Sequence, residues 1–230
     1  MGNRFRNEQK YLLSKSDIAM LDTRLMGIME KDPHLGDEAS YLIRSIYFDD
    51  PQNSCLHEKE DGVGVRQKWR IRSYNCSDNV IHLECKKKIR DMTWKDSISI
   101  TRSDLEDALN GSVQVSKEKE KLWNEFALLV ITKRYRPVTI VQYERVPYIW
   151  APSNVRITID RNLSSSISFD SFFEKYLPAR PVMPAGLDLL EVKYDTLLPD
   201  HLRHMLSLRN MRNTSFSKYE LCRRLPMSAF

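Results

Sequence analysis

The stretch Lys68-Trp69-Arg70-Ile71-Arg72 decides the fold predicted for this chain. Successive side chains of a β-strand point to opposite faces of a sheet, so residues two positions apart share one face. As a strand, the stretch places three cations on one face and two large apolar side chains on the other. It therefore predicts a sheet with one apolar face and one face that can hold an anion.

Four other segments of the chain repeat this alternation of charges. They are Arg6-x-Glu8-x-Lys10, Glu84-x-Lys86-x-Lys88, Arg156-x-Thr158-x-Asp160 and Glu191-x-Lys193. A polar sheet face in water is the commoner reason for such alternation, but these rows are strongly biased to arginine and lysine. Unpaired cations in a dry interior would each cost several kcal/mol. The pattern therefore favours a water-filled groove or tunnel lined by cations.

The composition predicts one compact domain over residues 1–230. The chain has 230 residues, of which 41% are hydrophobic, and this is enough to bury a sizeable core. Only seven glycines and ten prolines occur, without a low-complexity run, so a flexible linker is not expected. The net charge of +5 is small for a protein that coats nucleic acid. We therefore expect no specific nucleic-acid partner.

The start of the chain carries charges and lacks the apolar core of a signal peptide, and no later stretch approaches the ~18 apolar residues of a membrane span. We expect a cytoplasmic protein without a membrane segment. The cysteines lack CxxC spacing, and His201 and His204 lack further partners at metal-ligand spacing. Reduced thiols are expected rather than disulfides or a zinc site. The cysteines are Cys55, Cys76, Cys85 and Cys222.

The periodicity of apolar residues predicts an antiparallel α+β fold. Eight segments have strand character, at about 4–10, 41–49, 66–74, 80–88, 96–101, 138–149, 155–160 and 187–194. They occur in adjacent runs rather than in strict alternation with helices, which favours antiparallel pairing. We expect an eight-stranded tunnel with its charged face inward and amphipathic helices packed on its apolar outside.

Helix boundaries are predicted from capping residues. The expected caps are Ser16 at the start of the first helix, a capping box Ser103-x-x-Glu106 closed by Gly111, Pro199 at the start of a later helix, and a capping box Ser217-x-x-Glu220 at the start of the last. A further helix is expected over 117–132.

Seven motifs in order along the chain give it a resemblance to a known family. They are Arg6-Asn7-Glu8-Gln9-Lys10-Tyr11, Arg44-Ser45-Ile46-Tyr47-Phe48-Asp49, Lys68-Trp69-Arg70-Ile71-Arg72-Ser73-Tyr74, Tyr143-Glu144-Arg145, Arg156-Ile157-Thr158-Ile159-Asp160, Leu190-Glu191-Val192-Lys193-Tyr194 and Ser217-Lys218-Tyr219. Together they resemble the VTC domain, which is the polyphosphate polymerase branch of the triphosphate tunnel metalloenzymes in the CYTH-like superfamily. The similarity runs from residue 4 to about residue 224.

The resemblance implies a tunnel that binds a nucleoside triphosphate with Mn²⁺ or Mg²⁺ and transfers the terminal phosphoryl group of ATP to a polyphosphate chain. By resemblance, the catalytic phosphate-binding residues are Lys10, Arg70, Arg72, Lys86, Arg145 and Arg156. Lys218 joins this set, and Ser217 is its neighbour near the triphosphate. The charged rows add Arg6, Lys68, Lys88 and Lys193 as substrate-binding residues. Glu191 is the first choice of metal ligand, with Glu8 or Glu84 second.

The chemistry of phosphoryl transfer suits these residue types. The transferred group is loosely bonded and negatively charged, so catalysis consists mostly of alignment and charge stabilisation. The planar guanidinium of arginine can bind two phosphate oxygens at once. Mg²⁺ and Mn²⁺ prefer oxygen ligands and can complete their shells with phosphate and water, so one or two carboxylates are enough.

Several of these residues also have a purely structural explanation. Glu191 and Lys193 could form a cross-strand ion pair, and Ser217 could be only a helix cap. Asp160 is expected to pair with a cation of the charged face rather than to bind metal. Arg44 could serve only to hold a strand. Lys87 alternates out of the row of Lys86 and Lys88 and is expected in solvent.

One departure from the superfamily separates the candidate activities. Tunnel triphosphatases and their cyclase relatives usually open with Glu-x-Glu-x-Lys, whereas this chain has Arg6-x-Glu8-x-Lys10. A cation in place of one carboxylate disfavours a simple triphosphatase or cyclase. Two alternatives to the polymerase stay open: a hydrolase that acts on triphosphate or polyphosphate, and a non-catalytic module that binds polyphosphate or nucleic acid.

Overall fold

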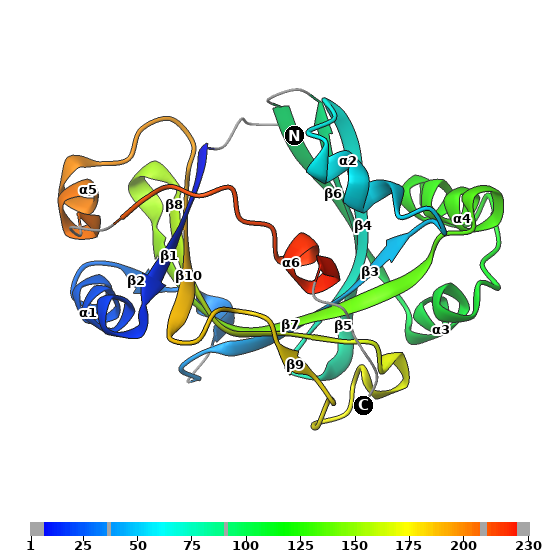
Figure 1. Cartoon of the computed structure of the whole chain (residues 1–230), viewed down its shortest axis with the longest axis horizontal. Helices are drawn as coiled ribbons and strands as arrows, with labels where there is room; N and C mark the ends of the chain where they lie inside the picture. Colours follow the sequence, from blue (N-terminus) through cyan, green and yellow to red (C-terminus); the bar gives the residue numbers. More distant parts are fainter. Residues whose placement is uncertain (1–6, 36–37, 90–91, 208–210, 225–230) are drawn as a thin grey trace. The chain divides into compact units, whose positions relative to one another are not determined.

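A computed structural model of the chain describes residues 7–35, 38–89, 92–207 and 211–224. It contains ten strands of one sheet together with six α-helices and three short 3-10 helices (Figure 1). The strand order is β1-β10-β8-β7-β3-β4-β5-β6, with β2 beside β7 and β9 beside β8. The strand pairs whose register is defined are all antiparallel. The predicted α+β class with an antiparallel sheet is therefore confirmed.

The chain divides into two compact units, each built from separated stretches of sequence. The first unit comprises Met1–Leu42, Tyr143–Leu163 and Pro181–Ser217, and the second comprises Ile43–Gln142, Ser164–Arg180 and Lys218–Phe230. The chain therefore crosses from one unit to the other inside strands β3, β7 and β8. The single domain over 1–230 and the enclosed tunnel stay predictions.

The first unit has its core between one face of its strands and two helices, α1 and α5 (Figure 1). Alternate residues of β8 and β10, such as Ile157, Ile159, Leu190 and Val192, point into this core and are fully buried. The elements of this unit are β1 (Asn7–Ser14), α1 (Lys15–Met26), β2 (Glu30–Lys31), η1 (Pro33–Leu35), η2 (Ala151–Ser153), β8 (Val155–Ser166), β10 (Leu187–Tyr194) and α5 (Asp200–Leu206). Strand β7 (Arg136–Trp150) contributes its second half.

The second unit packs helix α4 against the apolar face of its strands (Figure 1). Phe126 of α4 lies between Phe48 of β3 and Trp69 of β4, with ring centroids 5.0 and 5.6 Å away. The elements of this unit are β3 (Tyr41–Asp49), α2 (Ser54–Glu60), β4 (Val65–Tyr74), β5 (Ser77–Ile89), β6 (Met92–Ile100), α3 (Arg102–Asn110), α4 (Lys121–Lys133), η3 (Phe169–Ser171) and α6 (Lys218–Arg224). The short strand β9 (Arg180–Pro181) straddles the unit boundary.

All eight predicted strands are present, as β1, β3, β4, β5, β6, β7, β8 and β10. The first is observed at Asn7–Ser14 rather than at 4–10, and residues 4–6 lie outside the described residues. The two strands that the sequence pattern missed, β2 and β9, have only two residues each, too few to show a period. Helix α2 was also missed.

Two predicted caps were wrong by two residues. The first helix begins at Lys15, and its cap is Ser14 rather than Ser16, because the side chain of Ser14 accepts a hydrogen bond from the amide of Asp17. The capping box of α3 is formed by Thr101 and Asp104 instead of Ser103 and Glu106.

Other predicted boundaries agree with the structure. Gly111 ends α3 in the left-handed conformation that glycine favours, and Pro199 immediately precedes α5. Ser217 immediately precedes α6, and its capping role stays a prediction. None of the helices in the described ranges is long and apolar enough to cross a membrane.

Candidate functional site

The register of the first unit places its charged residues on one face of the sheet. Across β1 and β10, Glu8 lies opposite Lys193 and Lys10 lies opposite Glu191. Across β10 and β8, Lys193 lies opposite Arg156. Since directly opposed residues share a face, the alternation predicted from the sequence is realised, with the apolar residues of the same strands in the core.

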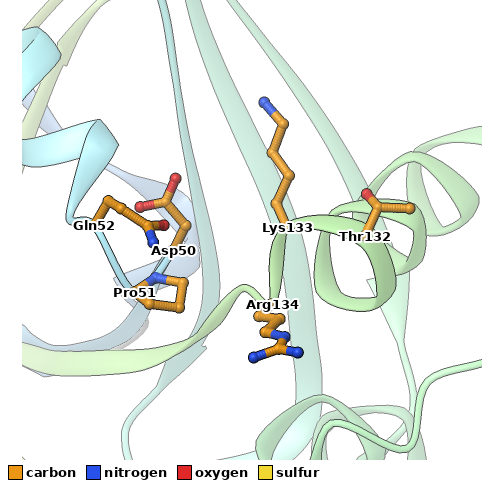
Figure 2. A pocket seen from close by; sticks show the side chains of 6 residues that line it. All are labelled: Asp50, Pro51, Gln52, Thr132, Lys133 and Arg134. Carbon is orange, nitrogen blue, oxygen red and sulfur yellow. The ribbon is translucent and has the colours of Figure 1, made fainter.

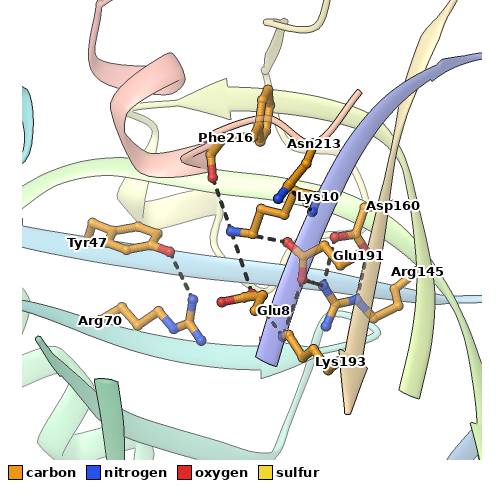
Figure 3. Close-up of polar contacts among 10 residues, drawn as sticks. All are labelled: Glu8, Lys10, Tyr47, Arg70, Arg145, Asp160, Glu191, Lys193, Asn213 and Phe216. Carbon is orange, nitrogen blue, oxygen red and sulfur yellow. Dashed lines mark hydrogen bonds and ion pairs between the residues drawn. The ribbon is translucent and has the colours of Figure 1, made fainter. Parts of the chain in front are cut away.

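Four of these side chains form a closed ring of ion pairs, which we call the four-charge ring: Glu8, Lys10, Glu191 and Lys193 (Figure 3). The Nζ atom of Lys10 lies 3.6 Å from Glu8 and 3.7 Å from Glu191. The Nζ atom of Lys193 lies 3.4 Å from Glu8 and 3.3 Å from Glu191. Each ammonium therefore lies between the same two carboxylates. Glu191 and Lys193 do form an ion pair, but along one strand; the cross-strand partner of Glu191 is Lys10.

The loop before α6 fixes Lys10 from the free edge of β1. The Lys10 ammonium donates to the carbonyl oxygen of Phe216 at 3.1 Å, and its backbone amide donates to Oδ1 of Asn213 at 3.2 Å (Figure 3). The amide of Thr214 donates back to the Lys10 carbonyl at 2.8 Å. The position of this lysine is thus set by both its own strand and the C-terminal segment.

Arg145 of β7 contacts two acidic residues of the same face. It donates two hydrogen bonds to Asp160, at 2.6 and 2.7 Å, and its Nη2 lies 3.6 Å from Glu191. Asp160 and Glu191 are both buried. The prediction that Asp160 pairs with a cation of the charged face is confirmed.

The four-charge ring fits a divalent cation bound together with phosphate. Glu8 and Glu191 offer hard oxygen donors side by side, and the two lysines beside them can neutralise phosphate oxygens. Among the described residues, no group of three or more histidine, cysteine or acidic side chains could hold a metal by itself. A metal here would have to complete its shell with phosphate oxygens and water.

The second unit also carries its cations on one face. Across β4 and β5, Lys68 lies opposite Lys86, Arg70 opposite Glu84, and Arg66 opposite Lys88. Across β3 and β4, Tyr47 lies opposite Arg70 and Ser45 opposite Arg72. Lys87 points to the other face, where its ammonium pairs with Glu125 at 3.0 Å and Asp96 at 3.5 Å, instead of only facing solvent.

Glu84 is surrounded by cations. Its carboxylate lies 2.6 Å from Arg70, 2.7 Å from Lys95 and 3.9 Å from Arg72. Burial alone would raise the pKa of Glu84, but these three positive charges lower it well below its usual range. Arg70 is held from the other side by the hydroxyl of Tyr47 at 2.9 Å (Figure 3). Glu84 therefore fixes two arginines of the cationic row.

The VTC domain family matches residues 5–225. The chain belongs to the VTC domain family. This membership places it among tunnel-type enzymes that bind triphosphates, which usually use a divalent metal. No curated protein sequence matches the chain.

Two solved structures share the fold of this VTC domain. A Bacillus halodurans protein provisionally described as an adenylate cyclase is 15% identical, with a TM-score of 0.52, over 89% of this chain and 87% of its own. A Vibrio parahaemolyticus protein with the same provisional description is 12% identical, with a TM-score of 0.52, over 96% of this chain and 98% of its own. At such identities the likeness shows the fold alone.

The predicted site residues of the VTC domain fall into two sets. The first unit holds Glu8, Lys10, Arg145, Arg156, Glu191, Lys193 and Ser217. The second holds Lys68, Arg70, Arg72, Glu84, Lys86, Lys88 and Lys218. Arg6 lies outside the described residues. Of the three predicted metal ligands, the structure brings Glu8 and Glu191 together, whereas Glu84 belongs to the other unit and is bound by cations.

Arg44 has the structural role that was considered for it. It is almost fully buried, and its guanidinium donates to Gln142 and to the carbonyl oxygens of Phe172 and Glu174, at 2.6 to 2.7 Å. It therefore holds the segment that follows η3.

An open hollow of about 490 Å³ lies elsewhere on the second unit, between the end of β3 and the end of α4 (Figure 2). Its lining residues are Asp50, Pro51, Gln52, Thr132, Lys133 and Arg134. None of the predicted site residues lines this hollow, so its position gives no support to a substrate site there.

Sequence reasoning missed Tyr47, Asp49, Tyr219 and Lys95 as parts of the charged face. Tyr47 and Asp49 continue the alternation of β3 on the side of Arg70, and Lys95 that of β6 on the side of Lys86. That period-2 signal could have identified these three residues. No signal along the sequence pairs Tyr219 with this face.

Proposed function

We propose that this VTC domain is a metal-dependent phosphotransferase that moves the terminal phosphoryl group of ATP onto a polyphosphate chain. The observation that carries the proposal is the arrangement of the cations, which line one face of each unit and are held there by buried carboxylates. Such a face suits a linear chain of phosphates better than a single small anion. Phosphoryl transfer of this kind also needs no side-chain nucleophile.

The proposed roles follow from the contacts of each residue. Arg70 and Arg72 are fixed by Glu84, so their guanidinium groups are pre-aligned for phosphate oxygens. Lys10 and Lys193 bind phosphate from the four-charge ring. Lys86, Lys88, Arg156, Lys218, Ser217 and Arg6 are proposed as further phosphate contacts.

Arg145 is proposed to act mainly through Glu191. Two of its nitrogen atoms already bind Asp160, which leaves fewer donors for substrate. Glu191, with Glu8 beside it, would hold Mg²⁺ or Mn²⁺, and the ion would offset the charge that develops on the phosphates. Glu84 is proposed as a positioning residue rather than a metal ligand, because three cations bind its carboxylate.

In the chemical step these side chains align the donor and the acceptor and stabilise the developing negative charge. A terminal oxygen of the acceptor phosphate forms a bond to the γ-phosphorus of ATP while the bond from that phosphorus to the β–γ bridging oxygen breaks, and ADP leaves. The residues hold donor and acceptor in line and exclude misaligned poses. If water took the place of the acceptor phosphate, the same phosphate-binding residues would support hydrolysis.

The test is a product analysis with labelled ATP and Mn²⁺. A polymerase yields long acid-labile polymer, and a hydrolase yields only orthophosphate. Cyclic AMP, which the descriptions of the two solved structures suggest for those proteins, would overturn the proposal, and so would binding without any turnover.

Variants connect the product to the charged face. Lys86→Ala should lower polymer formation at least tenfold at unchanged folding. Arg70→Ala should lower it as much in the folded protein, although this variant also loses stability because it removes a cation from the buried Glu84. The matched control is Arg102→Ala, which removes an exposed arginine of α3 that pairs with Asp78 and Glu106, lies over the ring of Phe173 and is not one of the predicted site residues. Full activity in both face variants would contradict the proposal.

A further inference from the structure

Helix α6 lies on the charged face of the second unit, opposite the face covered by α4 (Figure 1). The hydroxyl of Tyr219 donates to Oδ2 of Asp49 at 2.6 Å, and its ring centroid lies 5.0 Å from that of Tyr47. Tyr47 shares its face with Arg70. Tyr219 therefore attaches the last helix to the cationic row, whereas α4 covers the apolar face of the same strands.

The carboxylate of Asp49, which accepts the hydrogen bond from Tyr219, is firmly held. Asp49 is fully buried, at 0% exposure, and its other oxygen accepts hydrogen bonds from the backbone amides of Asp50 and Cys55, both at 2.9 Å. A buried carboxylate with three donors is strongly held. Tyr219 is itself buried, with 2% of its surface exposed.

The ring of Tyr219 in turn supports a lysine. The Nζ atom of Lys68 lies 4.8 Å from the ring centroid, which is within the range of a cation–π contact. Lys68 comes from β4, two residues before Arg70 on the same face. The tyrosine thus fixes the place at which an ammonium group joins the arginine row.

The charges around Lys68 favour an incoming anion. Burial, first, and the nearby charges of Lys59 and Lys86 lower the pKa of Lys68 to about 8, against the opposing influence of Cys55 and Glu220. Glu220 is itself shared between Lys59 at 3.6 Å and Arg224 at 2.9 Å. Cations from α2, β4 and β5 therefore gather beside Tyr219.

We propose that Tyr219, seated on Asp49, is a positioning residue that holds the ammonium of Lys68 as a ligand for a phosphate chain. This inference rests on the proposed function and deepens it. A phosphate chain beside Lys68 favours the charged form of the lysine, so binding above pH 8 draws a proton onto it. Affinity for the phosphate chain then falls as the pH rises through about 8, because the proton must be supplied from solution.

The experiment is calorimetric titration of the full chain with tripolyphosphate in EDTA, at pH 7 and pH 8.5, in two buffers of different ionisation heat. Proton uptake by tripolyphosphate itself is the same in both titrations, so it drops out of the difference between wild type and Lys68→Arg. Wild type should take up more protons than Lys68→Arg at pH 8.5, and the two should agree at pH 7.

Tyr219→Phe keeps the ring but removes its bond to Asp49. It should weaken tripolyphosphate binding about fivefold or more and reduce the proton uptake. The matched control is Tyr135→Phe, because it removes another buried hydroxyl of this unit, one that contacts Cys55 at 3.3 Å, and should bind as wild type.

The results distinguish failure of the proposed function from failure of this inference alone. If wild type does not bind tripolyphosphate, the proposed function fails together with this inference. If it binds but takes up the same number of protons as Lys68→Arg, or if a folded Tyr219→Phe binds as tightly as wild type, only the inference is overturned. Should Tyr219→Phe not fold, the comparison with Lys68→Arg still decides.

Discussion

Arg145 binds Asp160 through two parallel hydrogen bonds, from Nε to Oδ1 at 2.6 Å and from Nη2 to Oδ2 at 2.7 Å. Asp160 is buried and the Arg145 side chain is 13% exposed, and the guanidinium also lies 3.6 Å from Glu191. Asp160 therefore fixes an arginine that in turn neutralises a carboxylate of the four-charge ring. Through Arg145, Asp160 thus helps to hold Glu191 in place.

Asp160→Asn should destabilise the first unit. The substitution leaves Arg145 buried beside a neutral amide that can accept only one of its hydrogen bonds, and breaking a buried ion pair costs about 3–5 kcal/mol. Urea unfolding would measure the change. Glu144→Gln is the control, since Glu144 makes a peripheral bond to Asn162 at 3.1 Å and should change stability by about 0.5 kcal/mol or less. Equal stability of the two variants would refute a structural role for the pair.

Glu191→Gln should uncouple metal binding from phosphate binding. In the four-charge ring both lysines are bound by the carboxylates, so a metal on Glu8 and Glu191 would release the ammonium groups to phosphate. We expect Mn²⁺ and tripolyphosphate to strengthen each other's binding by about 1–3 kcal/mol in wild type, and the variant to lose this gain. Thermal shifts with each ligand alone and with both would measure it.

Asp188→Asn is the control for that coupling. Asp188 is a buried carboxylate of the same strand, but it pairs in register with Leu13 of the apolar face. Coupling should persist in this variant. If Asp188→Asn and Glu191→Gln lose it equally, the four-charge ring is not its origin.

Glu84→Gln should make stability less dependent on pH in acid. The pKa of Glu84 is lowered in the folded chain, so its ionised form stabilises the fold above the unfolded-state pKa of about 4.3, and this stabilisation is lost as the pH falls below that value. Wild type should therefore lose more thermal stability than Glu84→Gln between pH 5 and pH 2. At pH 7 the variant should be the less stable protein.

Glu106→Gln provides the comparison for Glu84. Glu106 also pairs with an arginine, Arg102 at 3.2 Å, but both side chains are exposed. An exposed pair contributes little, so this variant should follow the wild-type acid profile. An acid profile of Glu84→Gln that matches wild type as well would contradict the assigned role of the buried carboxylate.

The faces of the sheet were predictable because alternation is a local property. Once Arg70 and Lys10 were placed on strands, the period of two fixed which neighbours share their face, and all eight strands were found. The partners across the sheet were only partly predictable, since register depends on turns. The β4–β5 hairpin turns at Asn75 and Cys76, both in the left-handed region, and a register shift between Arg72 and Tyr74 then places Arg70 opposite Glu84.

Tyr219 shows what the sequence pattern could not supply. It bonds to Asp49, 170 positions away along the chain, and a tyrosine beside a capping serine is equally compatible with a helix that covers apolar surface. Glu84 was likewise expected as a metal ligand, because nothing along the chain indicates that Lys95 of the next strand also reaches it. Contacts between distant segments decide these roles.

Thr101→Ala should destabilise the second unit by about 1 kcal/mol, because Thr101 and not Ser103 caps α3. Oγ1 of Thr101 accepts from the amide of Asp104 at 3.1 Å, and Oδ2 of Asp104 accepts from the amide of Thr101 at 3.0 Å. Ser103→Ala is the matched control. It lies inside the first turn, where alanine is the better helix former, so stability should stay equal or rise slightly. Urea unfolding of both variants measures the difference, and a larger loss in Ser103→Ala would return the cap to the position that the sequence pattern first indicated.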